Sequence, residues 1–98
     1  MDRSTAIARL KAREPHLRAL GIASLSLFGS TARGDAGPAS DIDLAAHFAH
    51  DAKVGMFRFA EIAQMLTDLL EMPVDLVGEP ARSARMQQEI DRDRVRVF

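Results

Sequence analysis

The chain has 98 residues and a mass of 10.7 kDa, which suits one small domain and excludes a catalytic domain joined to a separate substrate domain. Its 13 basic and 14 acidic side chains nearly cancel, which argues against a domain that mainly coats nucleic acid. Cysteine is absent, so disulfides and thiolate metal sites are excluded.

The hydrophobic pattern predicts nine elements that alternate between helix and strand along the chain. In chain order they are helices at 4–11 and 15–20, a strand at 22–28, a short helix at 31–33, a strand at 41–48, a helix at 55–71, a strand at 73–77, a helix at 82–91 and a strand at 95–98. The clearest is the helix at 55–71, because Phe59, Ile62 and Leu66 form an apolar stripe at helical spacing. This order predicts an α/β (α+β) fold, a small mixed β-sheet with helices packed on one face.

Acidic residues occupy the polar face of two predicted strands. Asp41 and Asp43 alternate with apolar residues in the strand 41–48, so both carboxylates project from one face, roughly 6.5–7 Å apart along the chain. Such carboxylates repel each other, and a hard divalent cation such as Mg²⁺ relieves the repulsion. Asp75 repeats the pattern on the strand 73–77. Three carboxylates on the open face of one sheet can hold two ions about 3.5–4 Å apart, an arrangement used for phosphoryl transfer.

A candidate phosphate site lies upstream of these carboxylates. The predicted strand 22–28 ends in Gly29-Ser30 and turns into a helix, which presents unpaired backbone N–H groups. Gly29 has no side chain to block a phosphate, and Ser30 adds a hydroxyl donor. Arg33, one helical turn later, either pairs with a phosphate or braces the loop 34–40. A triphosphate can lie across that loop, with its tail on Gly29-Ser30 and its α-phosphate at the metal ions.

These motifs together carry a family resemblance. Segment 28–34, Phe-Gly-Ser-Thr-Ala-Arg-Gly, and segment 40–44, Ser-Asp-Ile-Asp-Leu, resemble the signature of the DNA polymerase beta-like nucleotidyltransferase superfamily. The small size and segment 74–77, Val-Asp-Leu-Val, resemble its minimal nucleotidyltransferases, which often act as antitoxins of HEPN-domain toxins. The resemblance covers nearly the whole chain, so we expect a single minimal nucleotidyltransferase domain over 1–98 with a palm-like sheet.

The resemblance implies a role for five residues and a reaction. It implies that Gly29 and Ser30 bind the nucleotide phosphates, that Asp41 and Asp43 bridge two Mg²⁺ ions, and that Asp75 holds the catalytic ion. It also implies ATP as substrate and transfer of AMP to a hydroxyl group. The implied acceptor is a tyrosine of a HEPN toxin, and the implied role is that of an antitoxin.

Other interpretations of the sequence stay open. A binding module without catalysis would neutralise a toxin by covering it, and nucleotidyl transfer to RNA or a small molecule is a further alternative. Asp41 and Asp43 are also acceptable as exposed residues at a strand start. Met56 and Phe57 fit helix packing or contact with a protein partner. The first residues carry no apolar segment and no stretch is long enough to span a membrane, so we expect a cytoplasmic protein without membrane contact. The acceptor, the base preference and the oligomeric state are not predicted.

Overall fold

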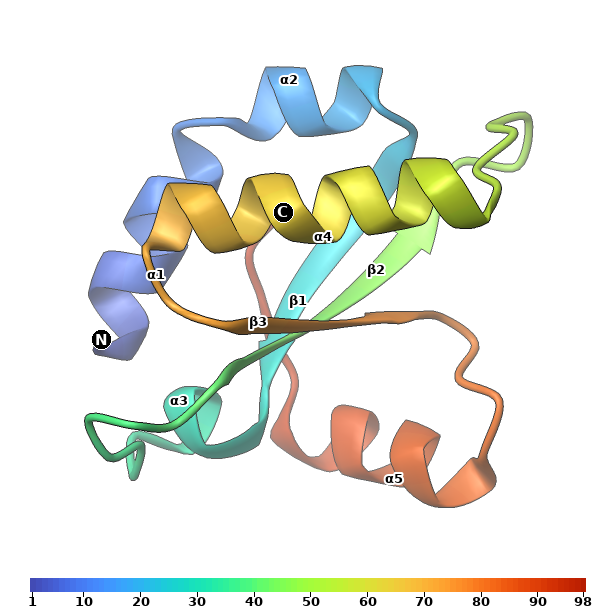
Figure 1. Ribbon diagram of the computed structural model, residues 1–98. Helices are drawn as coiled ribbons and strands as arrows, with labels where there is room; N and C mark the ends of the chain where they lie inside the picture. The colour runs from blue at the N-terminus through green and yellow to red at the C-terminus, as the bar shows by residue number, and fades with distance from the viewer.

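A four-stranded mixed sheet in the order β3-β2-β1-β4 forms the centre of the structure, a computed structural model that describes residues 1–98 (Figure 1). The helices are α1 (Arg3–Lys11), α2 (Glu14–Ala19), α3 (Gly29–Arg33), α4 (Met56–Leu70) and α5 (Ala84–Asp93), and the strands are β1 (Ile22–Phe28), β2 (Ile42–Phe48), β3 (Val74–Gly78) and β4 (Val95–Arg96). Strand β1 runs antiparallel to β2 and β4, whereas β2 and β3 are parallel and are joined through α4. The predicted order of elements and the mixed α/β fold class are confirmed.

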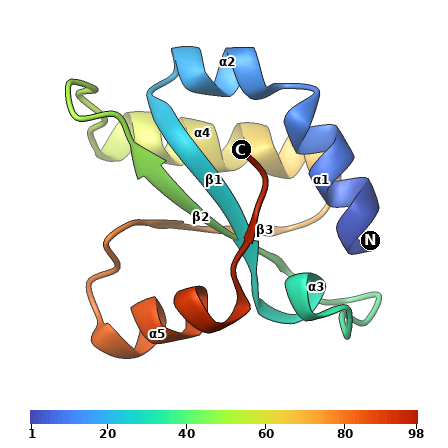
Figure 2. The ribbon, with the colours of Figure 1, turned by 180° about the vertical axis from the view of Figure 1, so that it is seen from behind.

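The main core lies between the sheet and helices α1, α2 and α4, which cover one face of the sheet (Figures 1 and 2). Ile62, Leu66 and Leu70 of α4 are buried against Leu25 and Leu44 of the strands. Burial of a side chain of this size stabilises the fold by about 1.5–3 kcal/mol. The apolar stripe predicted for the helix at 55–71 therefore supplies much of the core.

Helix α5 lies on the opposite face of the sheet, so the expectation that all helices pack on one face is wrong for this helix (Figure 2). Its Ile90 is fully buried against Phe28 and Ala45. Successive side chains of a strand point to opposite faces, so these two residues project away from the side that Leu27 and Leu44 cover. Their apolar side chains need a second cover, and α5 provides it.

The crossover from β2 through α4 to β3 brings the beginnings of two parallel strands together. The Ile42 N–H donates to the Pro73 carbonyl at 2.9 Å, and the register continues with Ile42 opposite Val74 and Asp43 opposite Asp75. The end of β1 lies on the other side of β2, with Phe28 opposite Asp43. The end of one strand and the starts of two others therefore meet at one edge of the sheet. None of the five helices combines the length and the apolar character that crossing a lipid bilayer requires.

Candidate active site

The structure brings the three predicted acidic residues to this edge of the sheet. Asp43 and Asp75 are direct neighbours in the parallel register of β2 and β3, and adjacent strands lie about 4.8 Å apart. Asp41 stands two residues before Asp43, just ahead of β2. Asp43 is half-buried, whereas Asp41 and Asp75 are exposed. The arrangement places one shielded carboxylate between two that solvent and ligands reach.

The electrostatics of this group favour a divalent cation. The pKa of Asp43 is raised above its ordinary value, first by burial and then by the negative charges of Asp75 and Asp41. No arginine, lysine or histidine forms an ion pair with any of the three. They do not form a closed protein cage, since no three acidic or histidine side chains are already arranged around one point. Their hard oxygens nevertheless fit Mg²⁺, which usually keeps water and phosphate oxygens among its ligands.

Gly29 brings the predicted phosphate turn into contact with Asp43. Its φ of +74° lies in the left-handed region, which residues other than glycine rarely adopt. A Cβ at this position would also collide with Oδ2 of Asp43 and lie only 3.0 Å from its Cγ. Glycine is therefore required here both for the backbone conformation and for the close approach of the turn to the carboxylate.

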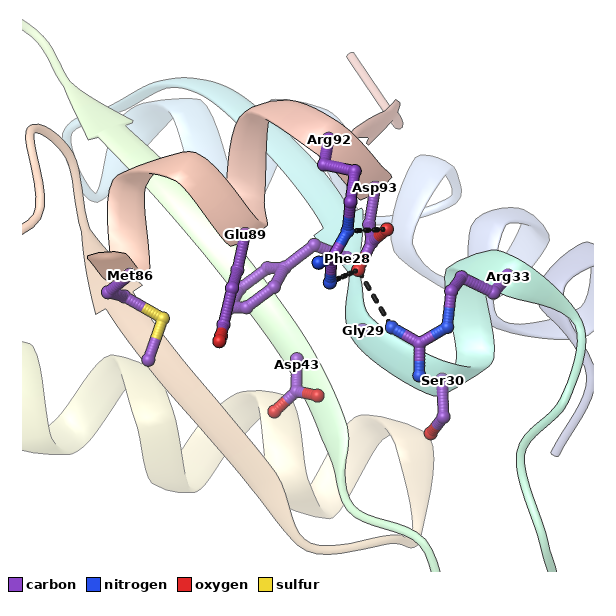
Figure 3. Close-up of a pocket in the computed structure, with 9 residues that line it drawn as sticks. All are labelled: Phe28, Gly29, Ser30, Arg33, Asp43, Met86, Glu89, Arg92 and Asp93. Atoms are coloured by element: carbon purple, nitrogen blue, oxygen red, sulfur yellow. Dashed lines mark hydrogen bonds and ion pairs between the residues drawn. The ribbon is translucent and has the colours of Figure 1, made fainter. Parts of the chain in front are cut away.

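A pocket of about 400 Å³ opens beside this contact (Figure 3). Gly29, Ser30, Arg33 and Asp43 all line it, so the predicted phosphate residues share one cavity with the half-buried carboxylate. Its volume falls within the range of about 300–1,000 Å³ typical of small-molecule sites. Asp41 and Asp75 lie outside its lining.

Comparison with known proteins identifies the domain. Residues 6–97 match the nucleotidyltransferase domain family. The chain belongs to this family. It is also 30% identical to a minimal nucleotidyltransferase of known structure, with a TM-score of 0.78 over 97% of this chain and 95% of that chain.

Two further solved structures come from toxin–antitoxin complexes. A toxin–antitoxin complex with AMP-PNP is 26% identical, with a TM-score of 0.75 over 92% of this chain and 72% of that chain. A complex of a tri-AMPylated Shewanella oneidensis HEPN toxin with MNT antitoxin is 22% identical, with a TM-score of 0.62 over 90% of this chain and 71% of that chain. At this identity the likeness shows the fold alone. No curated protein matches the sequence.

The pocket beside Gly29 has a second wall that the sequence did not predict. Helix α5 contributes Met86, Glu89, Arg92 and Asp93 to its lining. Figure 3 shows the carboxylate of Glu89 directed toward the same space as that of Asp43. The charges of α5 repeat at helical spacing and are typical of a solvated face. Only the docking of α5 on the acidic face of the sheet reveals that some of them line a site.

Arg33 serves the loop and the pocket at once. Its Nε donates to Asp35 at 3.3 Å and its Nη1 donates to Asp93 at 2.8 Å. The side chain is still 43% exposed. Both alternatives considered for this residue are therefore compatible with its position, since it braces the acidic loop and lines the cavity.

An apolar groove of about 720 Å³ adjoins the pocket beside Gly29, and Met86 lines both. Its other walls are the start of α4, the end of β3 and the segment 80–83 that precedes α5. Met56 lines the groove and is 79% exposed, and Phe57, the next residue of α4, is 82% exposed. Neither side chain is buried against the start of α4, and their exposure fits the interpretation that they contact a partner.

Proposed function

We propose that this nucleotidyltransferase domain transfers AMP from ATP to a tyrosine hydroxyl of a HEPN toxin, and that it acts in this way as an antitoxin. The observation that carries the proposal is the contact between the Gly29 turn and Asp43, with Asp75 beside it on the next strand. A phosphate held at that turn lies next to the carboxylates. The likeness to a toxin–antitoxin complex with AMP-PNP supports ATP as the nucleotide.

The proposed binding of ATP uses the two sides of this contact. The Ser30 hydroxyl, the backbone N–H groups of the turn and the Arg33 guanidinium bind the phosphates, because charge-assisted hydrogen bonds suit an anion. Asp41, Asp43 and Asp75 hold two Mg²⁺ ions. When bound, these ions neutralise phosphate charge and make the acceptor hydroxyl easier to deprotonate.

The proposed transfer step needs little covalent help from the protein. The acceptor oxygen forms a bond to the α-phosphorus of ATP, and the bond from that phosphorus to the pyrophosphate oxygen breaks. The hydroxyl proton passes to a carboxylate or to water. Asp75 is exposed, so an acceptor that belongs to another molecule has access to it. The domain contributes positioning and electrostatic stabilisation.

The proposed partner is a protein because the chain leaves an apolar surface beside the pocket. Met56 lines the groove that shares Met86 with the pocket, and the exposed Phe57 follows Met56 in α4. Exposed apolar side chains next to a cavity are typical of protein contacts. The same surface suits the alternative in which the domain neutralises the toxin by contact alone. The near-neutral charge argues against transfer to RNA.

The decisive experiment treats a HEPN toxin with the purified domain, labelled ATP and Mg²⁺, followed by mass spectrometry of the toxin. We expect a mass increase of one or more AMP groups on tyrosine and loss of toxin activity. Asp43→Asn should abolish the transfer. Asp68→Asn is the matched control, because Asp68 is exposed on α4 and its only side-chain partner is Gln64.

Two outcomes would contradict the proposal. Protection against the toxin without a mass increase would show neutralisation by contact. Transfer by Asp43→Asn at the wild-type rate would show that the carboxylates do not carry the reaction.

A further inference from the structure

A buried carboxylate joins two arginines at one end of the pocket. Asp93 is the last residue of α5, and its side chain is only 5% exposed. It accepts hydrogen bonds from Nε and Nη2 of Arg92 at 2.9 and 3.0 Å, and from Nη1 of Arg33 at 2.8 Å. Figure 3 shows the two guanidinium groups on either side of this carboxylate. All three residues line the pocket that contains Ser30.

The two arginines remain available to a ligand although the carboxylate between them is buried. The side chains of Arg92 and Arg33 are 64% and 43% exposed. An arginine has five N–H donors. Nη1 of Arg92 and Nη2 of Arg33 donate no hydrogen bond within the protein. Asp93 alone holds the guanidinium of Arg92, whereas Asp93 and Asp35 hold that of Arg33, and both guanidinium groups still offer N–H groups to an anion.

A purely structural role does not account for this group. The pair between Arg33 and Asp93 ties α3 to α5, but Arg92 and Asp93 are consecutive residues, so their two hydrogen bonds link no separate elements. A carboxylate at the C-terminus of a helix is also opposed by the helix dipole. The pKa of Asp93 is nevertheless lowered to about 2, mainly by hydrogen bonding from Arg92 and also from Arg33. The contact with Arg92 orients that arginine toward the pocket.

We infer that Arg92 is a second phosphate-binding arginine, and that Asp93 is a positioning residue that holds Arg92 and Arg33 for the terminal phosphates of a nucleoside triphosphate. The inference rests on the proposed function, because it requires a triphosphate in this pocket. The charges of the pocket favour it, since Asp43 and Glu89 alone would repel a triphosphate. Two fixed guanidinium groups opposite them supply the attraction, and planar guanidinium groups match phosphate oxygens.

The test is calorimetric titration of the purified domain in Mg²⁺ with three probes: ATP, AMP and inorganic tripolyphosphate. Arg92→Met keeps the apolar stem and removes the charge. It should weaken ATP and tripolyphosphate binding about tenfold and leave AMP binding unchanged, because AMP lacks the terminal phosphates. Arg58→Met is the matched control, since Arg58 is exposed on α4, forms no ion pair and does not line the pocket. It should bind all three probes like the wild type.

The positioning role of Asp93 is tested by a double-mutant cycle. Asp93→Asn should weaken ATP binding in the wild-type background, because the two arginines lose their common anchor. In the Arg33→Met, Arg92→Met background, Asp93→Asn should no longer weaken ATP binding, because neither arginine remains for the carboxylate to position. An undiminished effect of Asp93→Asn in that background would show that the carboxylate acts on the fold and not through the arginines.

The outcomes separate this inference from the proposed function. If the wild type binds ATP and Arg92→Met binds it with the same Kd, the inference is wrong and the proposed function stands. An equal loss of ATP and AMP binding in Arg92→Met also overturns it. If the wild type binds neither ATP nor tripolyphosphate, the proposed function fails and the inference falls with it. Arg92→Met leaves the buried carboxylate paired with Arg33, so it remains a valid test if Asp93→Asn does not fold.

Discussion

Substitution of Asp43 should separate stability from catalysis in this domain. The carboxylate is half-buried between the charges of Asp75 and Asp41 and has no ion-pair partner. Without metal ions, the folded protein therefore carries a repulsion that the unfolded chain avoids. Asp43→Asn keeps the side-chain shape and removes the charge, so it should stabilise the metal-free fold and abolish AMP transfer.

The size of the stability gain follows from the register of the sheet. Asp43 and Asp75 are direct neighbours on strands about 4.8 Å apart. Two unit charges about 5 Å apart repel by about 0.8 kcal/mol in bulk water and by about 3 kcal/mol at an effective dielectric constant of 20. The exposure of Asp75 favours the lower end, about 1 kcal/mol. For a domain of this size, that corresponds to an increase in Tm of about 4–8 °C.

Thermal unfolding in EDTA at neutral pH, with transfer measured in parallel, checks this expectation. Because the pKa of Asp43 is raised in the folded state, the wild type loses stability as the pH increases from about 3.9, the ordinary aspartate value, through that raised pKa. The difference between Asp43→Asn and the wild type should therefore be largest near pH 7 and vanish in acid. A Tm that falls by several degrees in Asp43→Asn, or a gain that persists at acid pH, would refute the argument from repulsion.

Three other perturbations give distinct outcomes. Gly29→Ala should destabilise the fold by about 1–3 kcal/mol and reduce ATP binding. Gly34 has a similar φ of +83° but open space where a Cβ would lie, so Gly34→Ala should cost only the smaller energy of the unfavourable backbone conformation. Chemical denaturation and calorimetry of both variants measure the difference. Phe57→Ser should leave ATP binding unchanged and weaken toxin binding at least tenfold in a pull-down or titration, and equal toxin binding would exclude the exposed start of α4 as the contact. Ile90→Ala should lower the free energy of unfolding in urea by about 2–4 kcal/mol, and it should weaken ATP binding because α5 loosens. Unchanged ATP affinity would show that α5 does not shape the pocket.

The sequence predicted the order of the elements and pointed to candidate site residues because the patterns that indicate them are local. The alternation in residues 41–48 places Asp41 and Asp43 on one face whatever the strand pairs with. The Gly29-Ser30 turn is likewise defined by its immediate neighbours. Asp75 repeats that local pattern on a second strand, but it lies beside Asp43 only because β2 and β3 pair in parallel, and this pairing was not predicted.

The position of α5 was not predictable on the same basis. An amphipathic helix shows which of its sides is apolar, but that side fits either face of a sheet. The choice depends on Phe28 and Ala45, whose side chains leave the second face apolar near the site. Phe28 lies in a strand with apolar residues on both faces, a pattern typical of a strand buried on both sides, and this pattern was the available signal.

The docking of α5 explains why the carboxylates alone give an incomplete account of this site. They form no closed metal cage, and the negative charges of Asp75, Asp41 and Glu89 repel that of Asp43. A triphosphate therefore needs positive charge from the protein as well as from metal ions. Arg33 and Arg92 provide it, and Asp93 can hold both only because α5 ends beside α3. The pocket thus combines residues that local spacing predicts, among them Arg33 and Asp43, with residues of α5 that only tertiary packing brings to it.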